Sequence, residues 1–157
     1  MLFRSLAAAV VVEGERDVVA WPAAALGVLA QTTTRVEAVE ALLAAIHAAN
    51  PHADVRYIDT VCAPTKARGA ALQALLPQID ALVVVGGRTS NNTLQLVERG
   101  RAAGIATWHV ETAPELRVEW FAGRQRVGLT AGTSTLPRTI DAVHARSEEH
   151  TSELQSP

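Results

Sequence analysis

Two short polar stretches of the sequence combine residue types that bind anions. They are residues 86–93, Gly-Gly-Arg-Thr-Ser-Asn-Asn-Thr, and residues 131–135, Ala-Gly-Thr-Ser-Thr. Each follows an apolar run and precedes a segment with helical spacing. A helix that begins in such a stretch presents unpaired backbone N–H groups and the positive end of its dipole, and Ser, Thr and Asn side chains add donors. The two stretches therefore predict a site for a phosphate-type anion that needs no lysine.

Two further junctions have the same form. Residues 31–34 read Gln-Thr-Thr-Thr, and residues 59–65 contain Cys62, the only cysteine of the chain. Ser, Thr and Asn are also the ordinary residues of helix N-caps, so any one junction taken alone has a structural interpretation. Cys62 taken alone also has a structural interpretation, as a small buried apolar side chain. Four junctions of one kind favour a shared ligand site.

The composition is that of a globular protein with a core. The chain has 157 residues, of which 48% are apolar and 19% charged, and its formal net charge is −2. This charge and the lack of a basic run give no reason to expect a nucleic acid partner. The apolar run at residues 6–12 is too short to cross a bilayer, so we expect a buried strand there and no membrane partner. A single cysteine favours a reducing, cytoplasmic setting.

Apolar periodicity predicts alternating strands and helices. The expected strands are residues 26–30, 55–58, 81–85, 105–110 and 127–130. The expected helices are residues 36–50, 70–79, 92–103 and 137–145. This alternation predicts an α/β fold of small, mostly parallel sheets flanked by helices. In such folds ligands bind beyond the carboxyl ends of the strands, which is where all four polar junctions fall.

The remaining ionisable side chains have structural interpretations. Glu111 and Glu115 are spaced like a carboxylate pair, but their surroundings favour a surface loop and a helix start. The histidines His52, His109 and His144 lack the mutual spacing of metal ligands, and we expect them to be structural or solvated.

The order and spacing of the four junctions resemble one known family, the LytB-type 4-hydroxy-3-methylbut-2-enyl diphosphate reductases. The resemblance runs from about residue 10 to residue 145. It rests on an ordered set of motifs: Gln31-Thr32-Thr33, Asp59-Thr60-Val61-Cys62 with Thr65 and Arg68, Val85-Gly86 with Ser90-Asn91-Asn92-Thr93 and Leu96, Glu115 with Trp120, and residues 127–134 with Pro137. No single motif is specific, but the ordered set is.

What the resemblance implies is an iron-sulfur reductase of three α/β lobes, of which this chain would contain two. In that family three cysteines hold a 4Fe-4S cluster, and Cys62 matches the third of them. Two electrons and two protons remove the allylic hydroxyl of a small diphosphate substrate as water, giving isopentenyl and dimethylallyl diphosphate. The implied electron donor is a reduced ferredoxin or a flavodoxin-type protein. A thiolate fits this role, because sulfur is the ligand that such clusters require.

The resemblance also implies which residues bind the substrate. Ser90, Asn92 and Ser134 match residues that hold the diphosphate, and Asn91 stands where a second serine is usual. Thr32 matches the threonine close to the reacting end of the substrate, where it supports proton delivery. Thr32 is therefore the residue of this chain that the resemblance places in catalysis.

The sequence departs from the full family pattern. The family's first two cluster cysteines, its diphosphate-binding histidines and its proton-relaying glutamate are not found here, so we expect a reductase fragment that is inactive alone. The expected parts are residues 1–58 from the middle lobe, residues 59–145 from the third lobe, and a non-native tail at residues 146–157. The tail is predicted because residues 146–156 resemble the translation of a common sequencing adapter. Gly69 also stands where glutamine is usual in the family.

Two other functions are compatible with the residues. One is a phosphate- or phosphosugar-binding α/β regulatory module without redox chemistry, in which Cys62 is structural. The other is an interaction domain that binds no small ligand. Two further cysteines encoded upstream in the same reading frame would favour the reductase.

Overall fold

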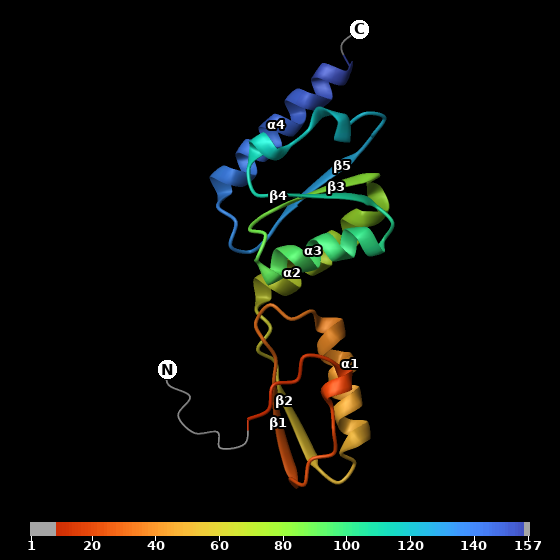
Figure 1. Ribbon diagram of the computed structural model, residues 1–157, viewed down its shortest axis with the longest axis vertical. Coiled ribbons are helices and arrows are strands. Elements are labelled where there is room, and N and C mark those ends of the chain that lie inside the picture. Colours follow the sequence, from red (N-terminus) through yellow and green to blue (C-terminus); the bar gives the residue numbers. More distant parts are fainter. Residues whose placement is uncertain (1–8, 156–157) are drawn as a thin grey trace. The chain divides into compact units, whose positions relative to one another are not determined.

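The computed structural model describes residues 9–155, which divide into two compact units (Figure 1). Unit 1 ends at Thr60 and unit 2 begins at Val61. Each unit has its own parallel sheet and is described by itself. The division falls close to the predicted one after residue 58, and the assignment of the units to the middle and third lobes of a reductase stays a prediction.

Unit 1 is built on a parallel pair of strands and one long helix. Its elements are the 3-10 turn η1 (Glu15–Asp17), strand β1 (Ala25–Leu29), helix α1 (Val36–Ala49) and strand β2 (Asp54–Ile58). The strands pair from Ala25 with Asp54 to Leu29 with Ile58. Parallel strands need a long crossover between them, and α1 provides it.

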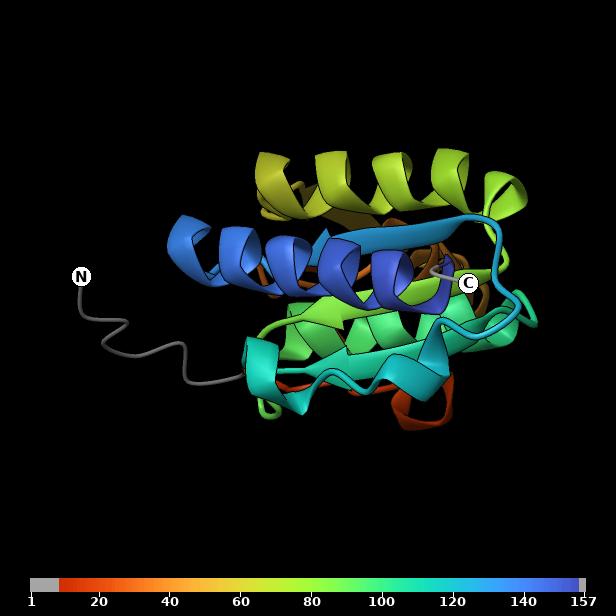
Figure 2. The ribbon, with the colours of Figure 1, turned by 90° about the horizontal axis from the view of Figure 1, so that it is seen from above.

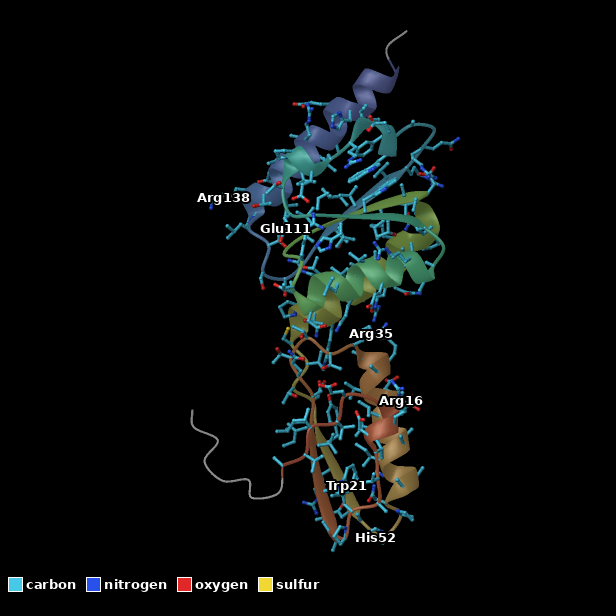
Figure 3. All side chains as sticks on the ribbon, viewed as in Figure 1. Arg16, Trp21, Arg35, His52, Glu111 and Arg138 are labelled. Carbon is cyan, nitrogen blue, oxygen red and sulfur yellow. The ribbon has the colours of Figure 1, made fainter. Side chains whose placement is uncertain are left out.

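Asn50 fixes the C-terminal end of α1. The residue is 1% exposed, and its side-chain amide donates to the carbonyls of Val19 and Ile46 at 3.1 and 2.9 Å. Its Oδ1 accepts a bond from Trp21 N–H at 2.7 Å, and His52 Nε2 donates to the Trp21 carbonyl at 2.9 Å. Figure 3 shows Trp21 and His52 at the same end of unit 1. This satisfied buried amide joins the segment before β1 to the helix end.

The apolar run at residues 6–12 is not the buried strand that its composition predicts. Residues 6–8 lie outside the described residues. Residues 9–12 form no strand, and Val10 and Val11 are 62% and 84% exposed. A strand needs a neighbour that pairs with its backbone groups. Within residues 9–155, β1 and β2 pair only with each other, so the run has no strand partner there.

Unit 2 is a three-layer arrangement around a parallel sheet. Its elements are α2 (Ala63–Leu75), η2 (Leu76–Gln78), β3 (Ala81–Val85), α3 (Asn91–Ala102), β4 (Ala106–Val110), η3 (Ala113–Glu115), η4 (Val118–Trp120), β5 (Val127–Ala131) and α4 (Pro137–Gln155). The strand order is β4-β3-β5, and both pairs are parallel. Helices α2 and α3 cover one face of the sheet and α4 covers the other (Figure 1). The predicted α/β fold with small parallel sheets flanked by helices is confirmed.

Strand β3 is the centre of the core of unit 2. All five of its residues are fully buried, and its side chains alternate between the two faces. Leu82 and Val84 pack against the cluster under α2, η2 and α3, which contains Leu72, Leu76, Leu96 and Val97. Val83 and Val85 pack on the other face with Val110, Leu116, Phe121, Ala131 and Val143. Each fully buried aliphatic side chain contributes about 1.5–3 kcal/mol, so the position of this strand is strongly fixed.

Helix α2 begins earlier than the sequence pattern predicts. The apolar spacing predicts a helix from residue 70, but α2 starts at Ala63 and includes Gly69. Pro64 lies in its first turn, where a missing backbone N–H has no helical partner to lose. Residues 63–69 are therefore helical and not part of the loop.

Helix α4 does not end near Ala145 as predicted. It continues without a break to Gln155, and His150 is 4% exposed with its ring centroid 5.8 Å from that of Phe121. The non-native origin of residues 146–157 stays a prediction. No helix in the described part of the chain is both long and apolar enough to cross a membrane.

Candidate functional site

The polar junctions of unit 2 gather at one edge of its sheet. The three strands end level, because Val85 is paired with Val110 on one side and with Ala131 on the other. Helices α2, α3 and α4 begin at that same edge, beyond the strand ends (Figure 2). The positive ends of three helix dipoles therefore lie beside the loops that follow the strands.

Residues 86–90 connect β3 to α3 and are called the Ser90 loop, and residues 132–136 connect β5 to α4 and are called the Ser134 loop. The first residue of each loop is bonded to the sheet. Gly86 N–H donates to the Val110 carbonyl, and Gly132 N–H donates to the Val85 carbonyl, each at 2.9 Å. The Gly86 carbonyl accepts a bond from His109 Nε2 at 2.8 Å. Gly86 has a φ of 152°, a conformation that glycine adopts without steric cost. Both loops are thus fixed before their helices begin.

Asn92 joins the two loops. It is 3% exposed, and its Oδ1 accepts a bond from Thr133 N–H at 3.0 Å. Ser90 is the N-cap residue of α3, and its Oγ accepts a bond from Thr93 N–H at 3.4 Å. One loop therefore uses a buried amide to hold the other at a fixed position.

Ser134 and Asn91 stand at the surface of these loops. Ser134 is exposed in a turn closed by the bond from Thr135 N–H to the Gly132 carbonyl at 3.0 Å. The Thr135 hydroxyl donates to the Val85 carbonyl at 3.0 Å, which ties the turn to the sheet. Asn91 is the first residue of α3 and is also exposed. Exposed donors at helix N-termini suit an anion that arrives from solvent.

The charge of Arg88 at this edge is compensated. Its guanidinium pairs with Glu115 and lies 3.6 Å from Glu111, and its backbone N–H donates to Glu111 at 2.8 Å. Burial opposes ionisation of Glu115, but bonds from Glu111 N–H and the Thr112 hydroxyl, with the Arg88 charge, hold its pKa below the ordinary value. Glu111 is labelled in Figure 3. Both carboxylates hold loops, in agreement with their structural interpretation.

Cys62 is the N-cap residue of α2. Its Sγ lies 3.0 Å from Thr65 Oγ1, and the Arg68 guanidinium donates to the Ala131 carbonyl at the end of β5. The Thr65 hydroxyl, followed by the Thr65 backbone N–H, lowers the pKa of the Cys62 thiol. Cys62 therefore lies at the same sheet edge, in surroundings that favour its thiolate.

One thiolate does not make a metal centre. Within residues 9–155, no three His, Cys, Asp or Glu side chains are grouped so that they could hold a metal ion. The whole sequence contains one cysteine, whereas a 4Fe-4S cluster is held by several thiolates. Cys62 has the chemistry of one cluster ligand, but the residues of this chain do not by themselves fit the cluster.

Thr32 belongs to unit 1. It is exposed in the turn after β1, where Thr34 N–H donates to the Gln31 carbonyl at 2.9 Å. The end of β1 is held by Thr60, whose hydroxyl accepts from Ala30 N–H at 3.0 Å and donates to the Ala30 carbonyl. Thr32 thus follows the carboxyl end of a parallel strand, as its junction predicts.

Comparison with known proteins decides the family. Residues 3–148 match the family model described as LytB protein. The chain belongs to the LytB family. It is 45% identical over 122 residues to the 4-hydroxy-3-methylbut-2-enyl diphosphate reductase of Anaeromyxobacter sp. (strain Fw109-5), and 36% identical over 124 residues to that of Aquifex aeolicus (strain VF5). These alignments cover 78% and 79% of this chain, which spans 42% of the length of each relative.

Solved structures of LytB relatives share the fold. A structure of (E)-4-hydroxy-3-methyl-but-2-enyl diphosphate reductase, the terminal enzyme of the non-mevalonate pathway, is 35% identical with a TM-score of 0.57, over 81% of this chain and 44% of that one. The E-1-hydroxy-2-methyl-but-2-enyl-4-diphosphate reductase of Plasmodium falciparum is 20% identical with a TM-score of 0.67, over 84% and 39%. The second likeness shows the fold alone. The predicted resemblance to LytB-type reductases is confirmed.

The structure brings most of the predicted LytB site residues together. Those of unit 2 lie at one sheet edge: Cys62, Ser90, Asn91, Asn92 and Ser134. Thr32 lies in the other unit, and the chemical roles of all six residues stay predictions. The sequence does not reveal that Thr93 separates the two loops. Glycine at positions 86 and 132 signals a close approach there, but it does not name the partner.

Proposed function

We propose that this chain carries the diphosphate-holding part of a 4-hydroxy-3-methylbut-2-enyl diphosphate reductase, an enzyme of isoprenoid biosynthesis. The bond between Asn92 and Thr133 N–H supports this most, because it fixes the Ser90 and Ser134 loops to each other. A diphosphate offers many acceptor oxygens and suits a group of N–H and hydroxyl donors at helix N-termini. Relatives that bear this name match most of the chain, which adds further support.

In this proposal Thr32 binds the reacting end of the substrate and supports proton delivery. The diphosphate is held by Ser90, Asn91, Asn92 and Ser134. The whole reaction replaces the allylic hydroxyl of the substrate by hydrogen, consumes two electrons and two protons and releases water. Its products are isopentenyl and dimethylallyl diphosphate.

Cys62 is proposed as one ligand of the 4Fe-4S cluster of the whole reductase. Its lowered pKa supports this role, because iron-sulfur clusters bind thiolates. The remaining ligands would come from outside this chain. The proposed electron donor is a reduced ferredoxin or flavodoxin-type protein, and the proposed setting is the cytoplasm, where a single reduced cysteine is usual.

The first test is pyrophosphate binding, measured by isothermal titration calorimetry. We expect a Kd of at best about 1 mM, which corresponds to about −4 kcal/mol. Ser134→Ala removes an exposed hydroxyl and should weaken binding about tenfold, and adding Asn92→Ala should abolish it. Ser147→Ala, farther along α4, is the matched control and should leave binding unchanged. Equal binding by the wild type and the double variant would exclude this site.

Ser90→Asp separates anion binding from folding. Aspartate caps a helix as well as serine does and favours the positive dipole end, so thermal stability should be kept. The added negative charge repels a diphosphate, so pyrophosphate binding should be lost. A Ser90→Asp variant that still binds pyrophosphate as the wild type does would show that the α3 N-terminus is not the site.

The same titration decides between the reductase and a phosphosugar-binding regulatory module. The paired loops offer donors to two adjacent phosphoryl groups, so pyrophosphate should bind more tightly than glucose 6-phosphate or inorganic phosphate. Tighter binding of the sugar phosphate would favour the regulatory module and contradict the reductase.

A further inference from the structure

Thr93 lies between the two loops of the candidate site. It is 1% exposed on the first turn of α3. A Cβ atom added at Gly86 or at Gly132 would overlap Thr93 Oγ1 in either case. One side chain is therefore in close contact with the first residue past β3 and with the first residue past β5.

The Thr93 hydroxyl contributes its volume and not a hydrogen bond. Among the residues that the structure describes, its buried Oγ1 has no hydrogen-bond partner, whereas the backbone N–H of the same residue is used by the Ser90 cap. A buried hydroxyl without a partner costs stability relative to an apolar group of the same shape. The contact with the two glycines is what this side chain provides.

The position of the Ser134 loop depends on this contact. Gly132 is tied to β3 through the Val85 carbonyl, and the next residue, Thr133, donates its N–H to Asn92 Oδ1. Asn92 directly precedes Thr93 on α3, so the bond pulls the loop toward the helix while the Thr93 side chain limits how near it comes. The Asn92–Thr133 bond and the Thr93 side chain together set one distance between the Ser90 and Ser134 loops.

We propose that Thr93 is a positioning residue, which sets the distance between the Ser90 and Ser134 loops and so lets both hold the same anion. This inference rests on the proposed function and adds a residue that contacts no ligand. It predicts that the effect of a larger residue 132 on anion binding depends on the size of the side chain at position 93.

The test uses Gly132→Ala and its combination with Thr93→Ala in the full chain. Gly132 is preferred to Gly86, because the φ of 152° at Gly86 would strain any substituted residue. Gly132→Ala should weaken pyrophosphate binding about tenfold in an NMR titration, because overpacking displaces the loop. The double variant removes Oγ1, and the nearest remaining Thr93 atom, Cβ, lies 3.3 Å from the new Cβ. Its affinity should return to within about threefold of wild type, since small shifts accommodate that separation.

Two further measurements keep the inference testable apart from the proposed function. Thr93→Val keeps the shape and should keep binding; loss of binding in a folded Val variant would mean that the hydroxyl itself serves the ligand and would overturn a purely spatial role. Hydrogen exchange of the Thr133 amide reports the loop position without any ligand. The exchange rate of this amide should increase in Gly132→Ala and return toward the wild-type rate in the double variant. This expectation holds even if the wild type binds no pyrophosphate, because absent binding would contradict only the proposed function. No recovery in the double variant would overturn the inference.

Discussion

At Cys62, the Thr65 hydroxyl is the largest cause of the lowered pKa of the thiol. Thr65 donates to the thiolate and lowers its pKa, so the reactive form persists to lower pH than in an ordinary cysteine. The rate of iodoacetamide alkylation should therefore fall only as the pH drops through this lowered pKa. Thr65→Val should move the midpoint of the pH–rate profile to higher pH, whereas Thr65→Ser should keep it. An unchanged midpoint in Thr65→Val would contradict the assignment.

Asn92 is the residue whose loss should damage the site edge most. Asn92→Ala leaves the half-buried Thr133 N–H without its acceptor, which should lower the free energy of unfolding by about 1 kcal/mol, as measured by urea unfolding. Glu98→Ala, exposed on the same helix, should change stability by no more than about 0.5 kcal/mol. Asn92→Asp keeps an acceptor oxygen for Thr133, so it should retain more stability than the alanine variant. The role would be refuted if the alanine variants at 92 and 98 were equally stable.

At the scale of elements, the C-terminal half of α4 belongs to the packing of unit 2. His150 is buried against Phe121, so His150→Ala should lower the free energy of unfolding by about 1–3 kcal/mol through the cavity it leaves. Glu149→Ala breaks an exposed ion pair with Arg146 and should cost less than about 1 kcal/mol. Thermal melts of the two variants measure the difference. Coincident melts would show that this half of the helix adds nothing to the core.

At the scale of the whole molecule, the two units should differ in local stability. In unit 2 the central strand β3 is fully buried between two helical layers, whereas unit 1 has a sheet of two strands whose side chains are half-buried or exposed. Two-stranded sheets are marginal, so the amides of β1 and β2 should exchange with solvent much faster than those of β3. Hydrogen exchange of the full chain measures this. Equal protection of the two sheets would show that unit 1 is more stable than its burial indicates.

The single cysteine leads to a prediction about iron. Anaerobic reconstitution of the monomer with iron and sulfide should give no stoichiometric 4Fe-4S absorbance, because one thiolate cannot hold a cluster against loss to solution. Cys62→Ser is the control and should take up the same small amount of iron. A full cluster in the wild type that disappears in Cys62→Ser would contradict this expectation.

Much of the fold follows from local sequence alone. The run at residues 81–85 is unbroken in its apolar character and is the buried central strand. The helix predicted from residue 92 begins at Asn91, with Ser90 as its N-cap residue. Such signals can be read locally, because a strand covered on both faces needs only apolar residues and a helix cap needs only the next few residues. The ordered junction motifs also determine the LytB family.

Only the tertiary structure decides what joins the site. Asn92 reaches Thr133 across 41 positions and Arg68 reaches Ala131 across 63, and no periodicity encodes such pairs. The same holds for Thr93 between two glycines and for His150 against Phe121. Conversely, an apolar pattern alone does not ensure burial: Val10 and Val11 are exposed, because no described strand pairs with them. The burial of a side chain and the distance between two loops depend on which residues, distant in the sequence, pack against them. Those contacts are determined by the packing of the whole sheet and its helices.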